Sequence, residues 1–227
     1  MAVNCRTILV AALACFCLAA VADNPAWQQP SGWPDRIIAT LAKDPASSFS
    51  VSWRTEASIT ETVAEIALAT AATRFDLAAK RVPAVSERFE FDPAWLEGQG
   101  NTDTSEWLID PVVFHGVTFT GLEPGTLYAY RVRGADDQWS SWRQIRTAPA
   151  DGPVEFLYFG DAQNGIRSHV TRMFDTASVV APEANFMLHA GDLVNKGLDD
   201  RLWAEWFEAG GRLFVSVPSI PVPGNLD

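Results

Sequence analysis

Val154-Glu155-Phe156-Leu157-Tyr158-Phe159-Gly160-Asp161 is the stretch that decides the fold: a short apolar run that closes on a glycine and a carboxylate. Two later stretches repeat the pattern, and they end at Gly191-Asp192 and Gly224-Asn225. Asp192 lies 31 residues after Asp161, and Asn225 lies 33 residues after Asp192. Each step is close to one strand–helix–strand unit. The repetition therefore predicts three parallel strands connected by helices.

Asp161, Asp192 and Asn225 each follow the end of a predicted strand. The carboxyl ends of parallel strands meet at one edge of a sheet, where open α/β folds place their sites. Two carboxylates and a carboxamide offer oxygen ligands to divalent or trivalent metal ions. A single Gly-Asp pair after a strand can also be an ordinary turn, because both residues favour turns. The ordered array of three blocks is what favours a metal site.

The segment from 153 to 227 has the pattern of an α/β unit. The continuous apolar run Val154–Phe159 is typical of a strand that is buried on both faces. Apolar residues at helical spacing follow between Ile166 and Ala177. A second helix is predicted to begin at Asp199-Asp200 and to stop at Gly210-Gly211, with Trp203, Trp206 and Phe207 in the core. Residues 213–222 are predicted to supply the third strand, which completes a βαβαβ arrangement.

The segment from Pro34 to Thr147 has a β pattern instead. Phe49, Val51 and Trp53 alternate with serines, and similar alternation recurs at 112–120 and 127–133. Short strands separated by turn signals predict a β-sandwich. The stretch Ser86–Trp107 is poorly periodic, so we expect an inserted loop there. Residues 148–153 form a linker rich in proline, glycine and small residues.

Residues 1–22 are interpreted as a signal peptide. Arg6 is the only charge before Asp23, an apolar stretch follows it, and Ala20-Val21-Ala22 resembles a cleavage site. A membrane anchor is the alternative, but the apolar stretch is shorter than the roughly 20 residues that a span requires. All three cysteines lie in this segment, so the mature chain would contain no thiol. We therefore expect a secreted or periplasmic protein without a stable membrane span after signal cleavage.

Composition sets further bounds. The formal net charge of −11 argues against binding to a nucleic-acid phosphate backbone. Of the three histidines, His189 is expected to be buried and hydrogen-bonded, His169 to be solvated on a helix, and His115 to be structural in the sandwich.

The three blocks resemble the signature of the calcineurin-like metallophosphoesterases, which have GD, GD and GNH[DE] motifs at the ends of successive strands. The preceding region, with Val51-Ser52-Trp53-Arg54-Thr55, resembles the N-terminal domain of purple acid phosphatases. Leu122–Tyr128 resembles the tyrosine corner of fibronectin type III domains. The resemblance implies a fibronectin III-like β-sandwich over 34–147, followed by the N-terminal part of a phosphoesterase domain over 153–227.

The resemblance also implies roles for the three oxygen-bearing residues. Asp161 matches the aspartate that binds one metal ion, Asp192 matches the aspartate that bridges two, and Asn225 matches the asparagine that binds the second. The expected cofactors are two divalent or trivalent metal ions (Fe, Zn or Mn), and the expected partner is a small phosphate-ester substrate. The implied activity is acid phosphatase-like hydrolysis.

Three positions depart from the family pattern. Asn195 stands where purple acid phosphatases have a tyrosine ligand, and Gln163, a poor metal ligand, stands where other members have histidine. Leu226 replaces the histidine that contacts phosphate and helps the leaving group, so no catalytic residue is assigned. The family's remaining histidine ligands lie farther downstream than Asp227, where this sequence ends. We therefore expect this chain by itself to be a poor phosphatase. The alternative is a non-catalytic secreted binding module with a relic phosphoesterase half-domain.

Overall fold

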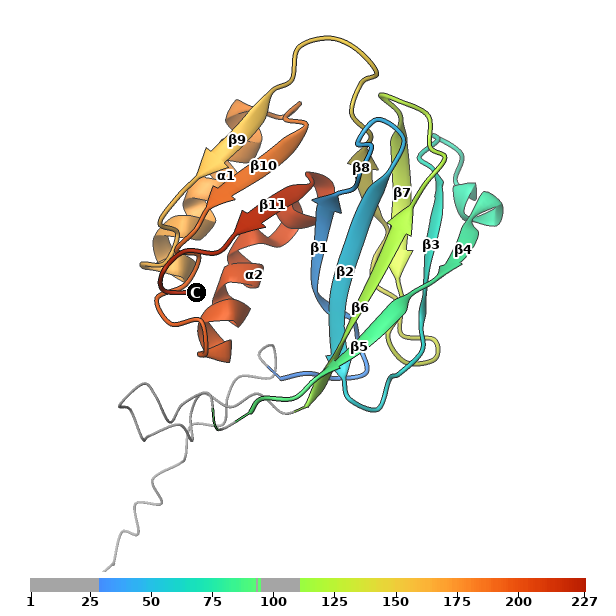
Figure 1. Ribbon diagram of the computed structural model, residues 1–227. Coiled ribbons are helices and arrows are strands. Elements are labelled where there is room, and N and C mark those ends of the chain that lie inside the picture. The colour runs from blue at the N-terminus through green and yellow to red at the C-terminus, as the bar shows by residue number, and fades with distance from the viewer. Residues whose placement is uncertain (1–28, 93, 95–110) are drawn as a thin grey trace, which may run out of the picture.

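The computed structural model describes residues 29–92, 94 and 111–227, and it has a β-sandwich followed by a smaller α/β unit (Figure 1). The strands of the sandwich are β1 (Asp35–Leu41), β2 (Phe49–Glu56), β3 (Val63–Leu68), β4 (Lys80–Pro83), β5 (Val85–Phe89), β6 (Val112–Phe119), β7 (Leu127–Val132) and β8 (Arg143–Arg146), with a short 3₁₀ helix at Phe75–Ala78. The elements of the α/β unit are β9 (Phe156–Phe159), a π-helical turn (Ile166–Val170), α1 (Thr171–Val180), β10 (Phe186–Ala190), α2 (Asp200–Ser216) and β11 (Ser219–Val222). The predicted sandwich and βαβαβ order are confirmed.

Two sheets organise these strands. One has four strands in the order β4-β3-β7-β8, and the other has seven in the order β5-β6-β2-β1-β11-β10-β9. The sandwich core lies between the four-stranded sheet and the β5-β6-β2-β1 half of the long sheet, around Phe49, Trp53, Phe119 and Tyr130. The strands β9, β10 and β11 are parallel, so their carboxyl ends reach the same edge. This edge carries the three candidate ligands.

A single parallel pair, Thr40 with Ser219, joins the two halves into one sheet. Helix α2 strengthens the join, because the hydroxyl of Tyr130 donates to the carbonyl oxygen of Val215 over 2.8 Å in a buried position. The linker composition did not indicate this continuity. Whether Pro34–Thr147 folds alone stays a prediction.

A charged cluster also crosses from the sandwich to α2. Arg36 donates two hydrogen bonds to the carboxylate of Asp200, at 2.6 and 2.8 Å, and the fully buried Arg54 binds Asp35 in the same two-pronged way. A bulge in β1 and a positive φ of 49° at Arg36 accompany this arrangement. A bulge re-aims the side chains around it. Arg36 thereby reaches a helix that lies 164 residues away in the sequence.

Part of the loop expected at Ser86–Trp107 is instead a strand. Residues Val85–Phe89 form β5, which pairs antiparallel with β6. The stretch has no clear alternation because it is an edge strand whose side chains are largely exposed or half-buried. Residue 93 and residues 95–107 of the expected loop lie outside the described residues.

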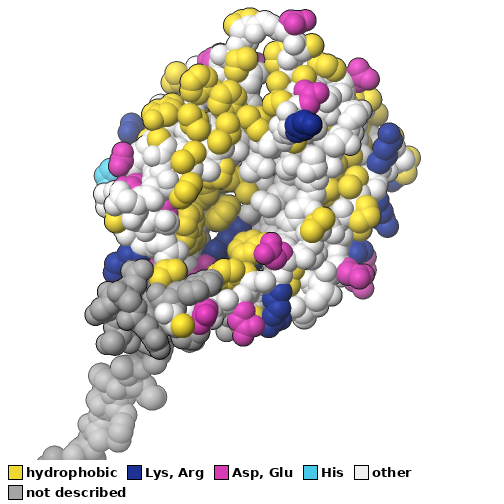
Figure 2. All heavy atoms as spheres, viewed as in Figure 1, with side chains coloured by type: hydrophobic (Ala, Val, Ile, Leu, Met, Phe, Trp, Pro, Cys, Tyr) yellow, Lys and Arg dark blue, Asp and Glu magenta, His cyan; other side chains and the backbone are white. Residues whose placement is uncertain are grey.

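The strand β9 is not buried on both faces, as its apolar run suggested. Phe156 and Tyr158 are 48% and 64% exposed, because α1 and α2 both pack on the opposite face of the sheet. Figure 2 shows a continuous hydrophobic area over β9 and β10 on this open face. Phe156 stacks there on Phe186, with ring centroids 5.0 Å apart. The α/β unit is thus covered by helices on one side only.

Helix α2 passes through Gly210-Gly211, where we expected it to stop. Gly211 has φ 39° and ψ −117°, which produces a kink, and the helix then continues to Ser216. Leu213, Phe214 and Val215 are therefore helical and buried, and only Ser219–Val222 form the third strand. Burial of the apolar side chains after the kink explains why the helix resumes.

No helix in the described part of the chain combines the length and the apolar character that a membrane span requires. The proposed signal peptide, residues 1–22, lies outside the described residues.

Candidate metal centre

The three motif residues lie at the ends of three neighbouring strands. Asp161 follows β9, Asp192 follows the central strand β10, and Asn225 follows β11. Asp161 and Asp192 have positive φ angles of 53° and 50°. Such angles are uncommon for non-glycine residues, are enriched in aspartate, and cluster at functional sites. Two of the three candidates thus occupy a strained backbone conformation at the same sheet edge.

Close backbone contacts hold the second and third blocks together. A Cβ atom on Gly191 would lie 2.7 Å from the Cα of Gly224, and one on Gly224 would overlap the Asp192 carboxylate. Asp192 Oδ1 accepts hydrogen bonds from the backbone N–H groups of Asn225, at 3.0 Å, and Leu226, at 3.3 Å. The glycines are therefore required because any side chain would separate the loops.

Asp227 has a structural task that the sequence comparison did not assign. Its Oδ1 accepts from the N–H of Gly224 at 3.1 Å, and its Oδ2 accepts from the N–H of Leu193 at 3.3 Å. The carboxylate thus ties the third block to the loop after Asp192. Asp227 matches the acidic residue at the end of the GNH[DE] pattern, and this match could have indicated its role in the sequence.

Asn195 connects the first and second blocks. Its side-chain nitrogen donates to the backbone oxygen of Gln163 at 2.9 Å and to Oδ1 of Asn164 at 2.8 Å. These bonds support a loop-forming role for Asn195. The first block is also tied to the second through the N–H of Asp161, which donates to the carbonyl of Gly191 at 3.3 Å.

The donor chemistry of the three residues fits a metal ion. The side chains of Asp161 and Asn225 are exposed and make no hydrogen bond or ion pair with the described residues, and Asp192 uses only one of its two oxygens for hydrogen bonds. Carboxylate and amide oxygens suit hard divalent and trivalent ions. No group of three or more His, Cys, Asp or Glu residues arranged for a metal occurs in 29–92, 94 and 111–227. The three candidate ligands do not form such a group, because the third of them, Asn225, is an asparagine.

The histidines do not join this site. His189 is buried as expected, but neither ring nitrogen has a hydrogen-bond partner among the described residues, which corrects the expected hydrogen bond. Aromatic rings surround it, and burial lowers its pKa to about 4. His115 is buried in the sandwich between Thr55 and Ser86, each 2.8 Å away, and burial lowers its pKa to about 4 as well. His169 is exposed on the π-helical turn.

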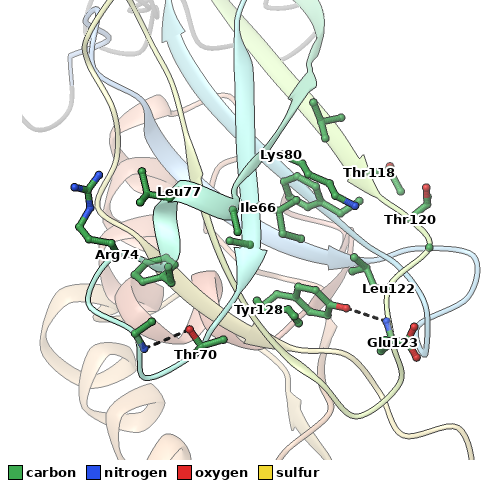
Figure 3. Close-up of a pocket in the computed structure, with 18 residues that line it drawn as sticks. Ile66, Thr70, Arg74, Leu77, Lys80, Thr118, Thr120, Leu122, Glu123 and Tyr128 are labelled. Atoms are coloured by element: carbon green, nitrogen blue, oxygen red, sulfur yellow. Dashed lines mark hydrogen bonds between the residues drawn. The ribbon is translucent and has the colours of Figure 1, made fainter.

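One pocket lies in the sandwich, away from the motif blocks. It has a volume of about 750 Å³ and lies beside β3, β4 and the loop before Tyr128. Figure 3 shows Arg74 and Leu77 along one side and Lys80, Thr118 and Thr120 along the other. The Tyr128 hydroxyl closes one end by accepting from the N–H of Glu123 at 2.9 Å, as the tyrosine corner predicted. The pocket volume is in the range of small-molecule sites.

A smaller pocket, of about 310 Å³, lies between the two halves. Phe114 from the sandwich and Leu198, Trp203 and Phe207 from the α/β unit contribute to its lining. Gly197, which also lines it, donates its N–H to the carbonyl of Leu226 at 2.8 Å. An aromatic surface is therefore adjacent to the loops that carry the second and third blocks.

Two sequence families match the chain. The family described as purple acid phosphatase, N-terminal domain, matches residues 34–147, which is half of the chain, and the family described as calcineurin-like phosphoesterase matches residues 154–227. A search of curated protein sequences finds no significant match.

Two solved structures have the same fold. Purple acid phosphatase PPD1 from yellow lupin (Lupinus luteus) seeds has a TM-score of 0.65 and 17% sequence identity, over 85% of this chain and 35% of that chain. PhoD has a TM-score of 0.52 and 14% identity, over 86% of this chain and 39% of that chain. The chain thus spans well under half of the length of either protein. On the family matches, the chain belongs to the purple acid phosphatase family, with that family's N-terminal domain followed by calcineurin-like phosphoesterase sequence.

Proposed function

We propose that this chain carries the first part of a two-metal site that hydrolyses small phosphate esters, in a protein that is exported to the periplasm or the outside of the cell. The observation that carries the proposal is the arrangement of Asp161, Asp192 and Asn225 at the ends of three adjacent parallel strands. The family matches support the same reading. The export part of the proposal rests on the pattern of residues 1–22 alone.

Each of the three residues has a distinct part in the proposed site. Asp192 follows the central strand, so it is the one that could share its carboxylate between two ions, with Asp161 on one side and Asn225 on the other. Two backbone N–H groups orient Asp192 through Oδ1, which leaves Oδ2 for the metal. When bound, Fe, Zn or Mn ions would polarise the phosphoryl oxygens and lower the pKa of a water nucleophile.

Leu226 limits what this chain can do by itself. Leu226 is 39% exposed and its backbone N–H donates to Asp192 Oδ1, but its apolar side chain can neither donate a proton to a leaving group nor stabilise negative charge. General acid catalysis contributes on the order of 10²–10⁴-fold in rate. In addition, three oxygen donors are fewer than two catalytic ions require. We therefore propose that the 227-residue chain binds metal weakly and turns over phosphate esters poorly.

The test combines metal binding with turnover. Purified chain should bind Mn²⁺ weakly, as measured by the loss of the free-ion signal in electron paramagnetic resonance. Asp192→Asn should weaken this binding further, whereas Asp175→Asn, an exposed aspartate on α1, should not. Hydrolysis of p-nitrophenyl phosphate with Mn²⁺, Zn²⁺ or Fe should be negligible. Equal Mn²⁺ binding by the two variants would refute the site, and robust hydrolysis that Asp192→Ala abolishes would refute the proposed poor turnover.

A second candidate function is a binding module, and the sandwich pocket is the observation that favours it. Its walls are mostly apolar, with Ile66, Leu68 and Leu77 among them, and Lys80 lies at its margin without an ion-pair partner in the described chain. This combination suits a small apolar molecule with an anionic group. Anilinonaphthalene sulfonate is a suitable probe. Lys80→Glu should weaken its binding at least about fivefold, about 1 kcal/mol, and Lys43→Glu, on the β1–β2 loop, should not. If Lys80→Glu and Lys43→Glu changed the binding of the probe equally, this pocket would be excluded as its binding site.

A further inference from the structure

We infer that the β-sandwich positions the third motif block of the proposed metal centre, through the ion pair between Arg36 and Asp200 and through the loop at Gly197. Arg36 and Asp200 are thereby positioning residues, which act on the site without contacting a metal ion. The inference rests on the proposed function, and it gives the sandwich a part in that function. A series of hydrogen bonds and one turn of helix connect Arg36 to the carboxylate of Asp192.

Asp200 is the point at which the sandwich holds the first turn of α2. Arg36 donates to the Asp200 carboxylate at 2.6 and 2.8 Å, and it also donates to the backbone carbonyl of Asp200 at 3.2 Å. Nη1 of Arg54, on β2, lies 3.5 Å from the same carboxylate. Only 7% of the Arg36 side chain and 19% of the Asp200 side chain are exposed. Because the Arg36 guanidinium binds both the side chain and the main chain of Asp200, it fixes the helix backbone at this residue.

The chemistry of this contact favours a positioning role over a purely stabilising one. A buried ion pair is seldom more stable than apolar residues packed in the same place, because both charges lose their hydration. A two-pronged hydrogen-bonded pair, however, permits a single geometry, whereas apolar side chains can repack. The backbone of Arg36 has a positive φ of 49°, which is strained for arginine. The strain and the buried charges therefore indicate that the contact specifies how α2 is oriented.

The first turn of α2 in turn holds the loop that precedes it. The indole N–H of Trp203 donates to the carbonyl of Gly197 at 2.7 Å. On the other side of this loop, the N–H of Gly197 donates to the carbonyl of Leu226 at 2.8 Å. A Cβ atom on Gly197 would lie 2.8 Å from the Cα of Asp227, so only glycine allows the two loops to approach this closely. The position of α2 is thus transmitted to the third block.

Leu226 connects the Gly197 loop to the candidate ligands. Its carbonyl accepts from Gly197, while its N–H donates to Oδ1 of Asp192 at 3.3 Å, beside the N–H of Asn225 at 3.0 Å. The C-terminal loop accordingly lies beside the segment that leads into α2 (Figure 1). A shift of α2 would therefore displace Asn225 relative to Asp192. Partners behind metal ligands typically contribute about 10–100-fold to metal affinity, and a residue that acts through several contacts should contribute less.

The first measurement needs no metal. Hydrogen–deuterium exchange of the full 227-residue chain, followed by mass spectrometry, reports on the N–H groups of Gly197 and Leu226. Asp200→Asn should raise the exchange rate of both at least about threefold, because local opening of the two loops becomes easier. Tyr130→Phe is the matched control, since it removes a hydrogen bond between the same two halves at the other end of α2. It should reduce stability in urea and leave both exchange rates unchanged.

The second measurement is the affinity for Mn²⁺, from electron paramagnetic resonance of the free ion, with circular dichroism as the check of folding. Asp200→Asn should weaken Mn²⁺ binding at least about threefold. Trp203→Phe should do the same, because it removes the N–H that holds the Gly197 carbonyl and leaves the ion pair intact. The double variant should lose less than the product of the two single effects, because both changes act on one series of contacts. Tyr130→Phe should bind Mn²⁺ as the parent does.

The outcomes separate this inference from the proposed function. If folded Asp200→Asn and Trp203→Phe match Tyr130→Phe in exchange and in Mn²⁺ affinity, the ion pair serves stability alone and the inference is overturned, while the metal site stands. Faster exchange without a loss of Mn²⁺ affinity would also overturn it, because the site would then not depend on the loop. If exchange rises but the parent binds no Mn²⁺, the sandwich does hold the third block and the proposed metal site is overturned. Faster exchange with weaker Mn²⁺ binding, confined to Asp200→Asn and Trp203→Phe, supports both.

Discussion

Acidification should destabilise the folded chain through His189, and replacement of this residue by leucine should remove that part of the loss. The ring of His189 is fully buried and lies 5.7 Å from the ring of Phe159, 5.5 Å from Trp206 and 5.7 Å from Phe214, measured between centroids. Neither of its nitrogens has a hydrogen-bond partner among the described residues. Burial lowers the pKa of His189 from 6.5 to about 4. The charged form is therefore strongly disfavoured in the folded state.

The size of the effect follows from proton linkage. In the unfolded chain the imidazole takes up a proton near pH 6.5, whereas in the folded chain it does so only near pH 4. The unfolded state thus binds more protons throughout this interval, and the free energy of unfolding falls as the pH falls. The contribution is complete above pH 6.5 and lost below pH 4. One pKa unit corresponds to about 1.4 kcal/mol, so the whole interval amounts to about 3 kcal/mol, and about 2 kcal/mol of it is lost between about pH 7.5 and about pH 5.

Urea unfolding at these two pH values, followed by tryptophan fluorescence, measures the loss. His189→Leu should lose about 2 kcal/mol less than the parent. At the higher pH it should be at least as stable, because two unsatisfied buried nitrogens are removed. His115 titrates in both chains, so its contribution cancels in the comparison. His169→Leu, an exposed histidine, is the control and should behave as the parent. Equal losses in the parent and in folded His189→Leu would refute the reasoning.

Three further predictions concern the junction, the sandwich and the open sheet face. Asp200→Ala should reduce the free energy of unfolding, measured in urea, by about 3–5 kcal/mol, because the buried side chain of Arg36 loses its carboxylate partner. Asp175→Ala, at an exposed position on α1, is the control, and a loss no larger than the control's would contradict this prediction. Tyr128→Phe should cost about 1 kcal/mol in thermal unfolding, since the N–H of Glu123 loses its acceptor, and an unchanged midpoint would show that the corner adds nothing. Phe156→Lys combined with Tyr158→Lys should reduce self-association in sedimentation velocity, because both side chains belong to the exposed apolar face of β9. Unchanged sedimentation would show that this face does not self-associate.

The motif blocks could be found in the sequence because their signal is local. An apolar run, a glycine and an oxygen-bearing side chain lie within eight residues, from Val154 to Asp161, and the same pattern recurs at one-unit spacing. Alternation was equally informative for β2, β6 and β7, where one face is buried in the sandwich. In these strands the spacing of apolar residues in the sequence matches the two-residue repeat of a β-strand with one buried face.

Other elements were missed because their periodicity is weak or interrupted. Strand β1 carries a bulge between Asp35 and Ile38, so its alternation breaks. In β3, Ala64 and Ala67 are buried together with Glu65, whose carboxylate accepts from Arg81 and Arg131, so both faces are covered. The Gly210-Gly211 pair, where α2 is kinked, is a residue pattern typical of a helix end. The buried apolar side chains that follow it are what extend α2.

The sequence by itself determined the two-part organisation, the order of the strands and helices in the α/β unit, and the identity of Asp161, Asp192 and Asn225 as candidate ligands. Only the tertiary structure decided that Thr40 pairs with Ser219 and that Arg36 binds a carboxylate 164 residues away. It also decided that one face of β9 is open, and that Oε1 of Gln163 is buried without a donor among the described residues. The reason is physical. Backbone propensity and side-chain period act over a few residues, whereas burial and ion pairing depend on which distant segments meet when the core forms.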